Sequence, residues 1–316
     1  MANYVRISTI GAAAAGGNPG TGQEAVDRMI DHWRARFERV LPDAPDLVLV
    51  PECCDRYPAH TMAERRAYYA YRGHQVGDYF ACVARRNNCY VAYPAVRLLP
   101  DGTWRNSVEL FDRDGISLGF YNKNYPVITE NAEGGILSGA EAPIFACDFG
   151  RVGCAICFDL NFDGIRRKYV AARPDLLLFA SMYHGGLMQA YWAYSCRAHL
   201  ATAICGLASG VISPVGQPLA MSTNYFDFVT VDANLDCQVA HLDFNGERLR
   251  AMKERYGAGV RVLDPGYLGS VLISSETDEV TSDDLVREFG IELLDDYMAR
   301  SIAHAEDPEH GEAAPG

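Results

Sequence analysis

Residues 153–159 read GCAICFD, a short stretch that bears on both the fold and the chemistry of the chain. The apolar run over residues 152–157 predicts a buried strand, and it ends abruptly at Asp159. A cysteine at the end of such a strand, just before a turn, is held at the top of the sheet, where layered α/β folds present nucleophiles. Taken alone, Cys157 is more consistent with one more buried structural cysteine than with a nucleophile.

Two charged residues follow other predicted strands. Glu52 comes directly after the apolar run 46–51 (DLVLVP), and Lys123 follows the predicted strand 116–121. An acid at the end of a buried strand costs desolvation energy unless it has a partner or a task. Each residue alone is also consistent with a strand-end ion pair. Together with Cys157 they supply a proton acceptor, an oxyanion-stabilising ammonium and a nucleophile.

Helical and strand-like patterns alternate along the chain, which predicts layers of an α/β fold. Residues 21–41 have apolar side chains at helical spacing, with Thr21 and Glu24 placed to form a capping box. Residues 65–86 and residues 188–203 read as two further helices.

Residues 107–121 predict a hairpin, and residues 122–142 predict a long loop after it. Residues 107–111 and 116–121 flank an Asp-Gly turn and predict the hairpin. The glycine-containing stretch 122–142 predicts a loop that covers part of the protein.

Three blocks of sequence resemble the signature blocks of the nitrilase, or carbon–nitrogen hydrolase, superfamily. They are LVLVPE (47–52), RNSVELFDRDGISLGFYNK (105–123) and FACDFGRVGCAICFDLNF (145–162), and they occur in the order typical of the family. Asn106–Ser107, Gly139 and Arg197–Ala198 are supporting matches. The resemblance runs from about residue 4 to residue 243 and implies a four-layer-forming α-β-β-α sandwich. It also implies a Glu–Lys–Cys triad formed by Glu52, Lys123 and Cys157.

The family also implies a second glutamate in the covering loop, which positions the lysine and the substrate. Glu130 has the better spacing from Lys123, whereas Glu133 precedes a glycine and lies closer to Gly139. We favour Glu130, and Glu133 stays open.

The implied reaction is hydrolysis of a non-peptide C–N bond through a cysteine thioester. Cys157 attacks, Lys123 and the backbone N–H of Phe158 hold the oxyanion, and Glu52 moves the proton and then activates water. No metal or cofactor is expected, because the eight histidines include no H-x-x-x-H pair.

The residues after the nucleophile favour a linear amide or N-carbamoyl compound as substrate, with release of ammonia or an amine. Nitrile-cleaving members usually have Cys-Trp-Glu, whereas Cys157–Phe158–Asp159 is closer to the Cys-Tyr-Asp of amidases and carbamoylases. Asn161 departs from the family, since amidase-like members usually carry arginine there. The expected substrate-binding residues are Tyr125, Phe158, Asn161, Tyr183 and His184.

Four other interpretations stay open. A nitrilase or an amide acyltransferase could use the same triad, and a catalytically silent relative could bind a ligand. The C-x-x-C pair of Cys154 and Cys157 allows a redox or zinc protein, but no second pair or histidine cluster accompanies it.

Composition restricts the partners. The 316-residue chain has a formal net charge of −13, which predicts no nucleic-acid or membrane partner. The ten cysteines and the lack of a signal-like start predict reduced thiols and a cytoplasmic location. We expect a single core domain over residues 1–245, an extension over 246–305 and a disordered tail over 306–316. By resemblance the extension contacts the partner in a homodimer or higher homo-oligomer.

Overall fold

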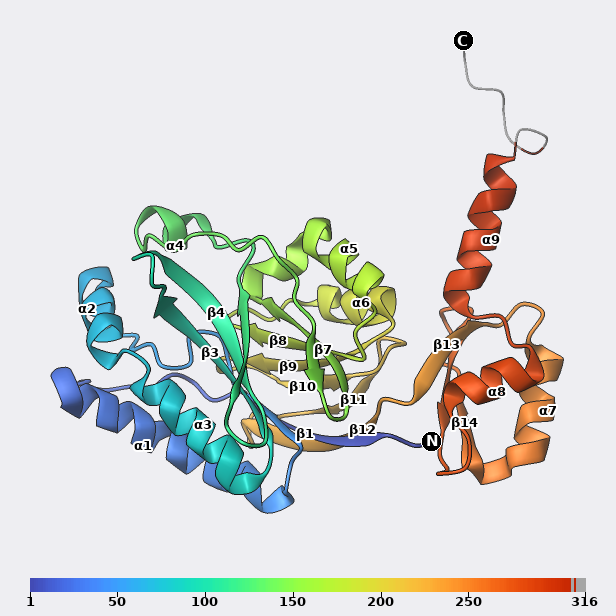
Figure 1. Cartoon of the computed structure of the whole chain (residues 1–316), viewed down its shortest axis with the longest axis horizontal. Helices are drawn as coiled ribbons and strands as arrows, with labels where there is room; N and C mark the ends of the chain where they lie inside the picture. Colours follow the sequence, from blue (N-terminus) through green and yellow to red (C-terminus); the bar gives the residue numbers. More distant parts are fainter. Residues whose placement is uncertain (308–309, 311–316) are drawn as a thin grey trace, which may run out of the picture. The chain divides into compact units, whose positions relative to one another are not determined.

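The computed structural model describes residues 1–307 and residue 310 (Figure 1). The chain forms two compact units. One unit is Val5–Ala233, and the other combines Met1–Tyr4 with Asn234–Gly316. The predicted boundaries at residues 245 and 305 stay predictions. Most of the predicted tail over 306–316 lies outside the described residues.

The larger unit is built on two sheets, each with six strands in the described part of the chain. The first sheet has the order β12-β1-β2-β3-β4-β5, and the second has the order β11-β10-β9-β8-β7-β6. The strands of the first sheet are β1 (Tyr4–Ile10), β2 (Leu47–Leu49), β3 (Tyr90–Leu98), β4 (Trp104–Phe111), β5 (Ser117–Asn122) and β12 (Phe228–Asn234). Those of the second are β6 (Phe145–Cys147), β7 (Gly150–Ile156), β8 (Leu176–Ser181), β9 (His199–Ile204), β10 (Gly210–Ile212) and β11 (Pro218–Met221).

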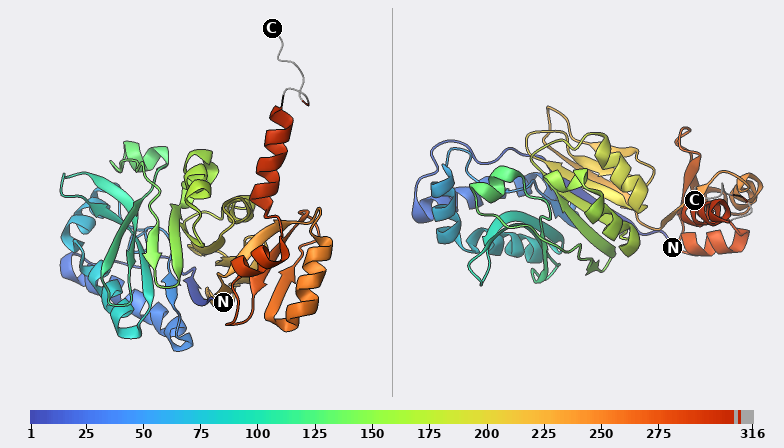
Figure 2. Two further views of the ribbon diagram at one scale, coloured as in Figure 1. Left: turned by 45° about the vertical axis from the view of Figure 1, so that its right-hand side comes forward. Right: turned by 90° about the horizontal axis from the view of Figure 1, so that it is seen from above.

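Helices cover the outer faces of both sheets in this unit (Figures 1 and 2). The helices α1 (Gly22–Val40), α2 (Met62–Arg72) and α3 (Gln75–Asn87) lie over the first sheet. The helices α5 (Asp163–Ala172) and α6 (Leu187–Cys196) lie over the second. This arrangement confirms the predicted α-β-β-α sandwich. Within residues 1–307, no helix has the combined length and apolarity needed to cross a membrane.

Amphipathic patterns explain the helix layers, as α1 shows. Its buried side chains recur at helical spacing and pack in the core of the first sheet: Ala25, Val26, Met29, Trp33, Phe37 and Val40. Trp33 also donates a hydrogen bond to the carbonyl of Cys54 at 3.0 Å, so its one polar group is satisfied inside the core.

Three expectations about the helices need correction. Thr21 is the N-cap residue of α1, but its side chain accepts no capping hydrogen bond. The predicted helix 65–86 is two helices, because Gly73 adopts φ +53° and ends α2. The predicted helix 188–203 ends at Cys196, and the chain then enters β9. That segment is fully buried and pairs in parallel with β8, so tertiary pairing overrides its local helical pattern.

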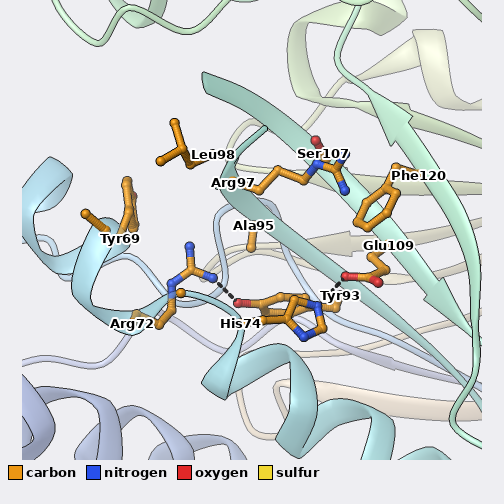
Figure 3. Close-up of a pocket in the computed structure, with 12 residues that line it drawn as sticks. Tyr69, Arg72, His74, Tyr93, Ala95, Arg97, Leu98, Ser107, Glu109 and Phe120 are labelled. Atoms are coloured by element: carbon orange, nitrogen blue, oxygen red, sulfur yellow. Dashed lines mark hydrogen bonds and ion pairs between the residues drawn. The ribbon is translucent and has the colours of Figure 1, made fainter. Parts of the chain in front are cut away.

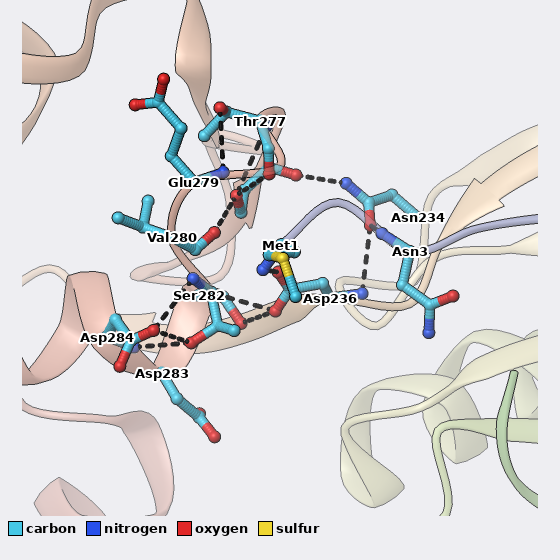
Figure 4. Close-up of polar contacts among 12 residues, drawn as sticks. Met1, Asn3, Asn234, Asp236, Thr277, Glu279, Val280, Ser282, Asp283 and Asp284 are labelled. Atoms are coloured by element: carbon cyan, nitrogen blue, oxygen red, sulfur yellow. Dashed lines mark hydrogen bonds and ion pairs between the residues drawn. The ribbon is translucent and has the colours of Figure 1, made fainter.

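The smaller unit has its own sheet and core. Its sheet has the order β13-β15-β14, from β13 (Cys237–His241), β14 (Val260–Leu263) and β15 (Ser270–Ser275). Its helices are α7 (Gly246–Tyr256), α8 (Ser282–Phe289) and α9 (Leu294–Glu306). Asp236 ties this unit together, because its carboxylate accepts hydrogen bonds from the Met1 amino group and from the backbone N and Oγ of Ser282 (Figure 4).

Candidate active site

The three predicted triad residues come from strand ends in both sheets. Glu52 follows β2, Lys123 follows β5, and Cys157 follows β7, where it begins the short 3-10 helix η2 (Cys157–Asn161). Lys123 Nζ lies 2.7 Å from Glu52 Oε1, and the Glu52 and Lys123 side chains are charged neighbours of the Cys157 thiol. All three residues are buried. The fold therefore brings together the carboxylate, the ammonium and the thiol that the sequence placed more than thirty residues apart.

The covering loop contributes a second carboxylate through the short helix α4 (Ile128–Ala132). Glu130 Oε2 accepts hydrogen bonds from Lys123 Nζ at 2.7 Å and from the backbone N of Val127 at 2.9 Å. Glu133 follows the helix and is exposed. The geometry thus places Glu130 beside the triad and leaves Glu133 outside it, while a catalytic role for Glu130 stays a prediction.

Asn106 joins the two carboxylates. Its Nδ2 donates to Glu52 Oε1 at 2.8 Å and to Glu130 Oε1 at 2.9 Å, and the residue is buried on β4. Asn106 belongs to a family block, and the block alone predicts no role for it. A buried amide next to the hairpin was a possible signal, but its two acceptors come from distant segments.

Electrostatics keep the thiol neutral and the lysine charged. Burial, followed by the nearby Glu52 carboxylate, raises the pKa of Cys157 to about 12. Burial would lower the pKa of Lys123, but the Glu52 and Glu130 carboxylates outweigh it and hold that pKa above its ordinary value. At neutral pH, attack by sulfur therefore requires a proton acceptor, and the ammonium is always present to stabilise negative charge.

Cys157 lies in a strained turn that Asp159 supports. Cys157 has φ +49°, a left-handed conformation that non-glycine residues rarely adopt. Asp159 is fully buried and accepts hydrogen bonds from Ile156 N at 2.9 Å, Tyr121 Oη at 2.6 Å and Tyr125 N at 2.8 Å. These three bonds link the end of β7 to β5 and the covering loop. Burial raises the pKa of Asp159 to about 6, so this acceptor is ionised at neutral pH.

A cavity of about 200 Å³ opens onto the triad. Its lining includes Glu52, Lys123, Glu130 and Cys157, together with Arg56, Met62, Arg65, Val127, Thr129 and Met182. The sequence reasoning did not identify either arginine as part of the site.

The five expected substrate-binding residues are not among the side chains that line this cavity. Asn161 Nδ2 donates to the hydroxyl of Tyr183 at 3.1 Å, and the Tyr125 ring stacks on Phe162. Phe158 is partly exposed, and His184 is exposed, with its Nδ1 accepting from Gly186 N. Their contact with a substrate stays a prediction.

A larger cavity, of about 360 Å³, lies between α2 and the first sheet (Figure 3). Glu109 and His74 form a hydrogen bond of 2.8 Å in its wall, and Arg72 donates to the hydroxyl of Tyr93. Side chains alternate along a strand, so Glu109 and Asn106 of β4 point to opposite faces of the sheet. The larger cavity therefore lies on the side of β4 away from the triad.

Neither a metal cluster nor a redox pair is evident. In the described part of the chain, no group of three or more His, Cys, Asp or Glu side chains could hold a metal ion. Cys154 is fully buried, and burial raises the pKa of its thiol, whereas redox-active cysteines are accessible and acidic. The expectation that no metal or cofactor is needed stays a prediction.

The α-β-β-α sandwich, with Glu52, Lys123 and Cys157 buried at strand ends, defines the class of this α/β protein. A family model described as carbon–nitrogen hydrolase matches residues 11–208, which is well over half of the chain. The chain therefore belongs to the carbon–nitrogen hydrolase family, in the nitrilase superfamily. Comparison with curated proteins gives no significant match.

Solved structures share the fold. A carbon–nitrogen hydrolase from Helicobacter pylori aligns with a TM-score of 0.64 and 14% identity over 80% of this chain and 93% of that one. A second match is a variant of the amidase from Nesterenkonia sp. with the acetamide moiety of fluoroacetamide added covalently at its active-site cysteine. Its TM-score is 0.62 and its sequence identity is 19%, over 80% of this chain and 96% of that one. A Saccharomyces cerevisiae member of branch 10 of the nitrilase superfamily aligns with a TM-score of 0.61 and 13% identity, over 81% of this chain and 95% of that one. At these identities the likeness shows the fold alone.

Proposed function

We propose that this carbon–nitrogen hydrolase cleaves a small linear amide or N-carbamoyl compound through a thioester on Cys157, releasing ammonia or an amine. One observation carries the proposal. A buried lysine is hydrogen-bonded to two carboxylates, and these three groups line one cavity together with a buried thiol. Transfer of an acyl group to sulfur requires a thiol that attacks, a carboxylate that accepts the thiol proton and a cation that stabilises the oxyanion.

The first step is attack of Cys157 sulfur on the substrate carbonyl. Because the pKa of the thiol is raised to about 12, its proton moves to Glu52 as the C–S bond forms. The carbonyl oxygen becomes negative and is stabilised by Lys123. The backbone N–H of Phe158 is the second expected donor, since it lies in the first turn of η2, where N–H groups lack helical acceptors.

The second half restores the enzyme. Glu52 passes its proton to the leaving nitrogen, the C–N bond breaks, and the acyl group remains on sulfur as a thioester. Glu52 then takes a proton from water, which attacks the thioester and releases the acid. Glu52 then returns this proton to the Cys157 sulfur, which restores the neutral thiol and the carboxylate.

Two further facts support an amide over the alternatives. The Cys-Phe-Asp sequence at 157–159 is closer to the amidase pattern than to that of nitrile-cleaving members. A variant of the Nesterenkonia amidase carries the acetamide moiety of fluoroacetamide at its active-site cysteine, so in that amidase a cysteine is the nucleophile, as we propose for Cys157. A silent ligand-binding relative is disfavoured, because a binding protein gains nothing from buried charges whose desolvation is costly.

The test is ammonia release from a panel of linear amides, N-carbamoyl amino acids and nitriles. Wild type is compared with Cys157→Ala and with Cys82→Ala, a control cysteine on α3. We expect an amide or ureido compound to turn over, Cys157→Ala to be inactive and Cys82→Ala to stay within twofold of wild type. Hydroxylamine competing with water would reveal acyl transfer as a hydroxamate product. No turnover on the whole panel, with iodoacetamide labelling Cys157 no faster than an ordinary thiol, would favour the silent relative.

The assembly and location are proposed on the family resemblance. A homodimer or higher homo-oligomer is expected, and light scattering of the full chain measures its mass. A cytoplasmic location and the lack of nucleic-acid and membrane partners likewise stay predictions.

A further inference from the structure

Two arginines share the catalytic cavity with the triad. Arg56 lies in the loop after Glu52, and Arg65 lies in the first turn of α2. Both line the cavity of about 200 Å³ that also contains Cys157 and Lys123. Among the described residues, neither guanidinium forms an ion pair with a carboxylate. Two unpaired cations beside a reactive thiol need a physical explanation.

The hydrogen bonds of both arginines are incomplete. Arg56 Nη2 contacts the sulfur of Met182 at 2.6 Å, and thioether sulfur is a weak acceptor. Arg65 Nη2 has only a long contact, of 3.5 Å, with the carbonyl of Pro58. The Nε atom of each arginine is buried and has no partner.

Within residues 1–307, the Nε atom of Arg72 also has no partner, although Arg72 is paired with Asp55. Arg56 and Arg65 differ from Arg72 because they border the cavity of the triad and have no carboxylate partner in the described part of the chain, which leaves their guanidinium groups able to bind a ligand acceptor.

The charge of the cavity wall indicates the sign of that ligand. Its ionisable groups are the carboxylates of Glu52 and Glu130 and the cations Lys123, Arg56 and Arg65. The Cys157 thiol is neutral, because its pKa is raised to about 12. Three cations against two carboxylates leave one positive charge. This local charge is opposite in sign to the formal charge of −13 on the whole chain.

We infer that the substrate is a small amide or ureide that also carries one carboxylate, which Arg56 and Arg65 hold while its amide carbonyl faces Cys157. This inference rests on the proposed function and names the substrate class. Guanidinium groups match carboxylates in planar, bidentate geometry. A cavity of about 200 Å³ has room for roughly seven water-sized groups, since each water occupies ~30 Å³ of liquid. Succinamate and N-carbamoylglycine are of this size and charge.

The test compares isosteric pairs that differ only in charge. Succinamate is paired with succinamide, and N-carbamoylglycine is paired with its amide. For wild type we expect kcat/KM to be at least about tenfold higher for the anionic member of each pair, chiefly through KM, with the preference falling as salt is added. The readout for variants is the ratio of anionic to neutral kcat/KM.

Charge variants assign that preference to the two arginines. Arg56→Gln and Arg65→Gln should each lower the ratio by about tenfold, and Arg65→Lys should retain part of it. Arg86→Gln changes an exposed arginine of α3, and its ratio should match that of wild type. Thermal melts of each variant distinguish lost recognition from lost folding.

Binding to the inactive Cys157→Ala protein separates this inference from the proposed function. Calorimetric titration should show succinamate binding more tightly than succinamide, and Arg56→Gln in that background should remove the difference. Anion-selective binding without turnover by wild type would support the carboxylate site and contradict the hydrolase. Turnover of succinamide and succinamate at equal kcat/KM, or equal binding of both, would overturn the carboxylate site and leave the hydrolase standing.

Discussion

Replacing Glu130 by glutamine removes one of the two carboxylates that hold Lys123. In the native chain, Glu130 Oε2 accepts from Lys123 Nζ and from Val127 N, while Oε1 accepts from Asn106 Nδ2. A glutamine of the same size has one oxygen and one NH₂ group. In either orientation, its NH₂ group faces at least one existing donor, so the variant cannot reproduce all three bonds.

The expected loss follows from the charge-assisted bond to Lys123. A hydrogen bond to a charged group contributes about 1.5–3 kcal/mol, and each 1.36 kcal/mol on the barrier is tenfold in rate. Glu130→Gln should therefore lower kcat/KM by about 10- to 150-fold. Lys123 keeps Glu52 as a partner, so the folded structure should be retained.

The assay is steady-state ammonia release with whichever substrate wild type turns over, beside near-ultraviolet circular dichroism of each variant. Glu133→Gln is the matched control, because this exposed glutamate lies three residues away. Its kcat/KM should stay within twofold of wild type. A folded Glu130→Gln protein with more than a third of wild-type activity, or an equal loss in Glu133→Gln, would refute the reasoning.

Three further predictions concern stability. Asp159→Ala leaves two buried donors and one partly buried donor without an acceptor, so urea unfolding should show a loss of about 3 kcal/mol; a loss under 1 kcal/mol would contradict the supporting role of this carboxylate. Gly153→Ala should cost about 1–3 kcal/mol in the same assay, because its Cβ would meet the Tyr169 ring at 2.6 Å; an unchanged free energy of unfolding would show that the ring moves freely. The hydrogen bond to Glu109 raises the pKa of His74 from 6.5 to about 9, so its stabilisation is complete below pH 6.5 and is lost as pH rises through 9. The Tm difference between wild type and His74→Asn should follow that course, and a pH-independent difference would argue against the pair.

Local patterns predicted the α/β layers and the three strand-end residues, whereas the α-β-β-α sandwich was implied by the resemblance to the family. An apolar run defines a buried strand, and the next charged or reactive residue must lie at the edge of the sheet. Glu52, Lys123 and Cys157 all follow this rule, and the structure brings them to one cavity.

Other parts of the site depend on contacts that no local pattern specifies. Glu130 and Glu133 are separated by less than one helical turn, and only the path of α4 decides which carboxylate meets Lys123. Asn106 bonds two carboxylates from segments on either side of it in the chain. Arg56 and Arg65 resemble surface arginines until the loop after β2 and the start of α2 are seen to border one cavity.

The errors in the predicted helices 65–86 and 188–203 have different causes. Gly73 at φ +53° divides a segment whose apolar pattern continues across the break. The segment of β9 has a helical pattern, yet burial beside β8 makes it a strand. The first error has a local cause, because a glycine with positive φ ends a helix, whereas in the second a distant partner in the fold outweighs the local preference.

Glu130 Oε2 serves two groups at once, the backbone N–H of Val127 at the start of α4 and the ammonium of Lys123. The first turn of this loop helix and the field at the nucleophile are therefore coupled through a single atom. A substitution that unwinds α4 would change the charge balance around Lys123 even if it never touched a reacting group. Sequence changes in the covering loop should thus alter the pH profile of the reaction as well as access to it, which makes this loop a place where evolution can tune reactivity without altering Glu52, Lys123 or Cys157.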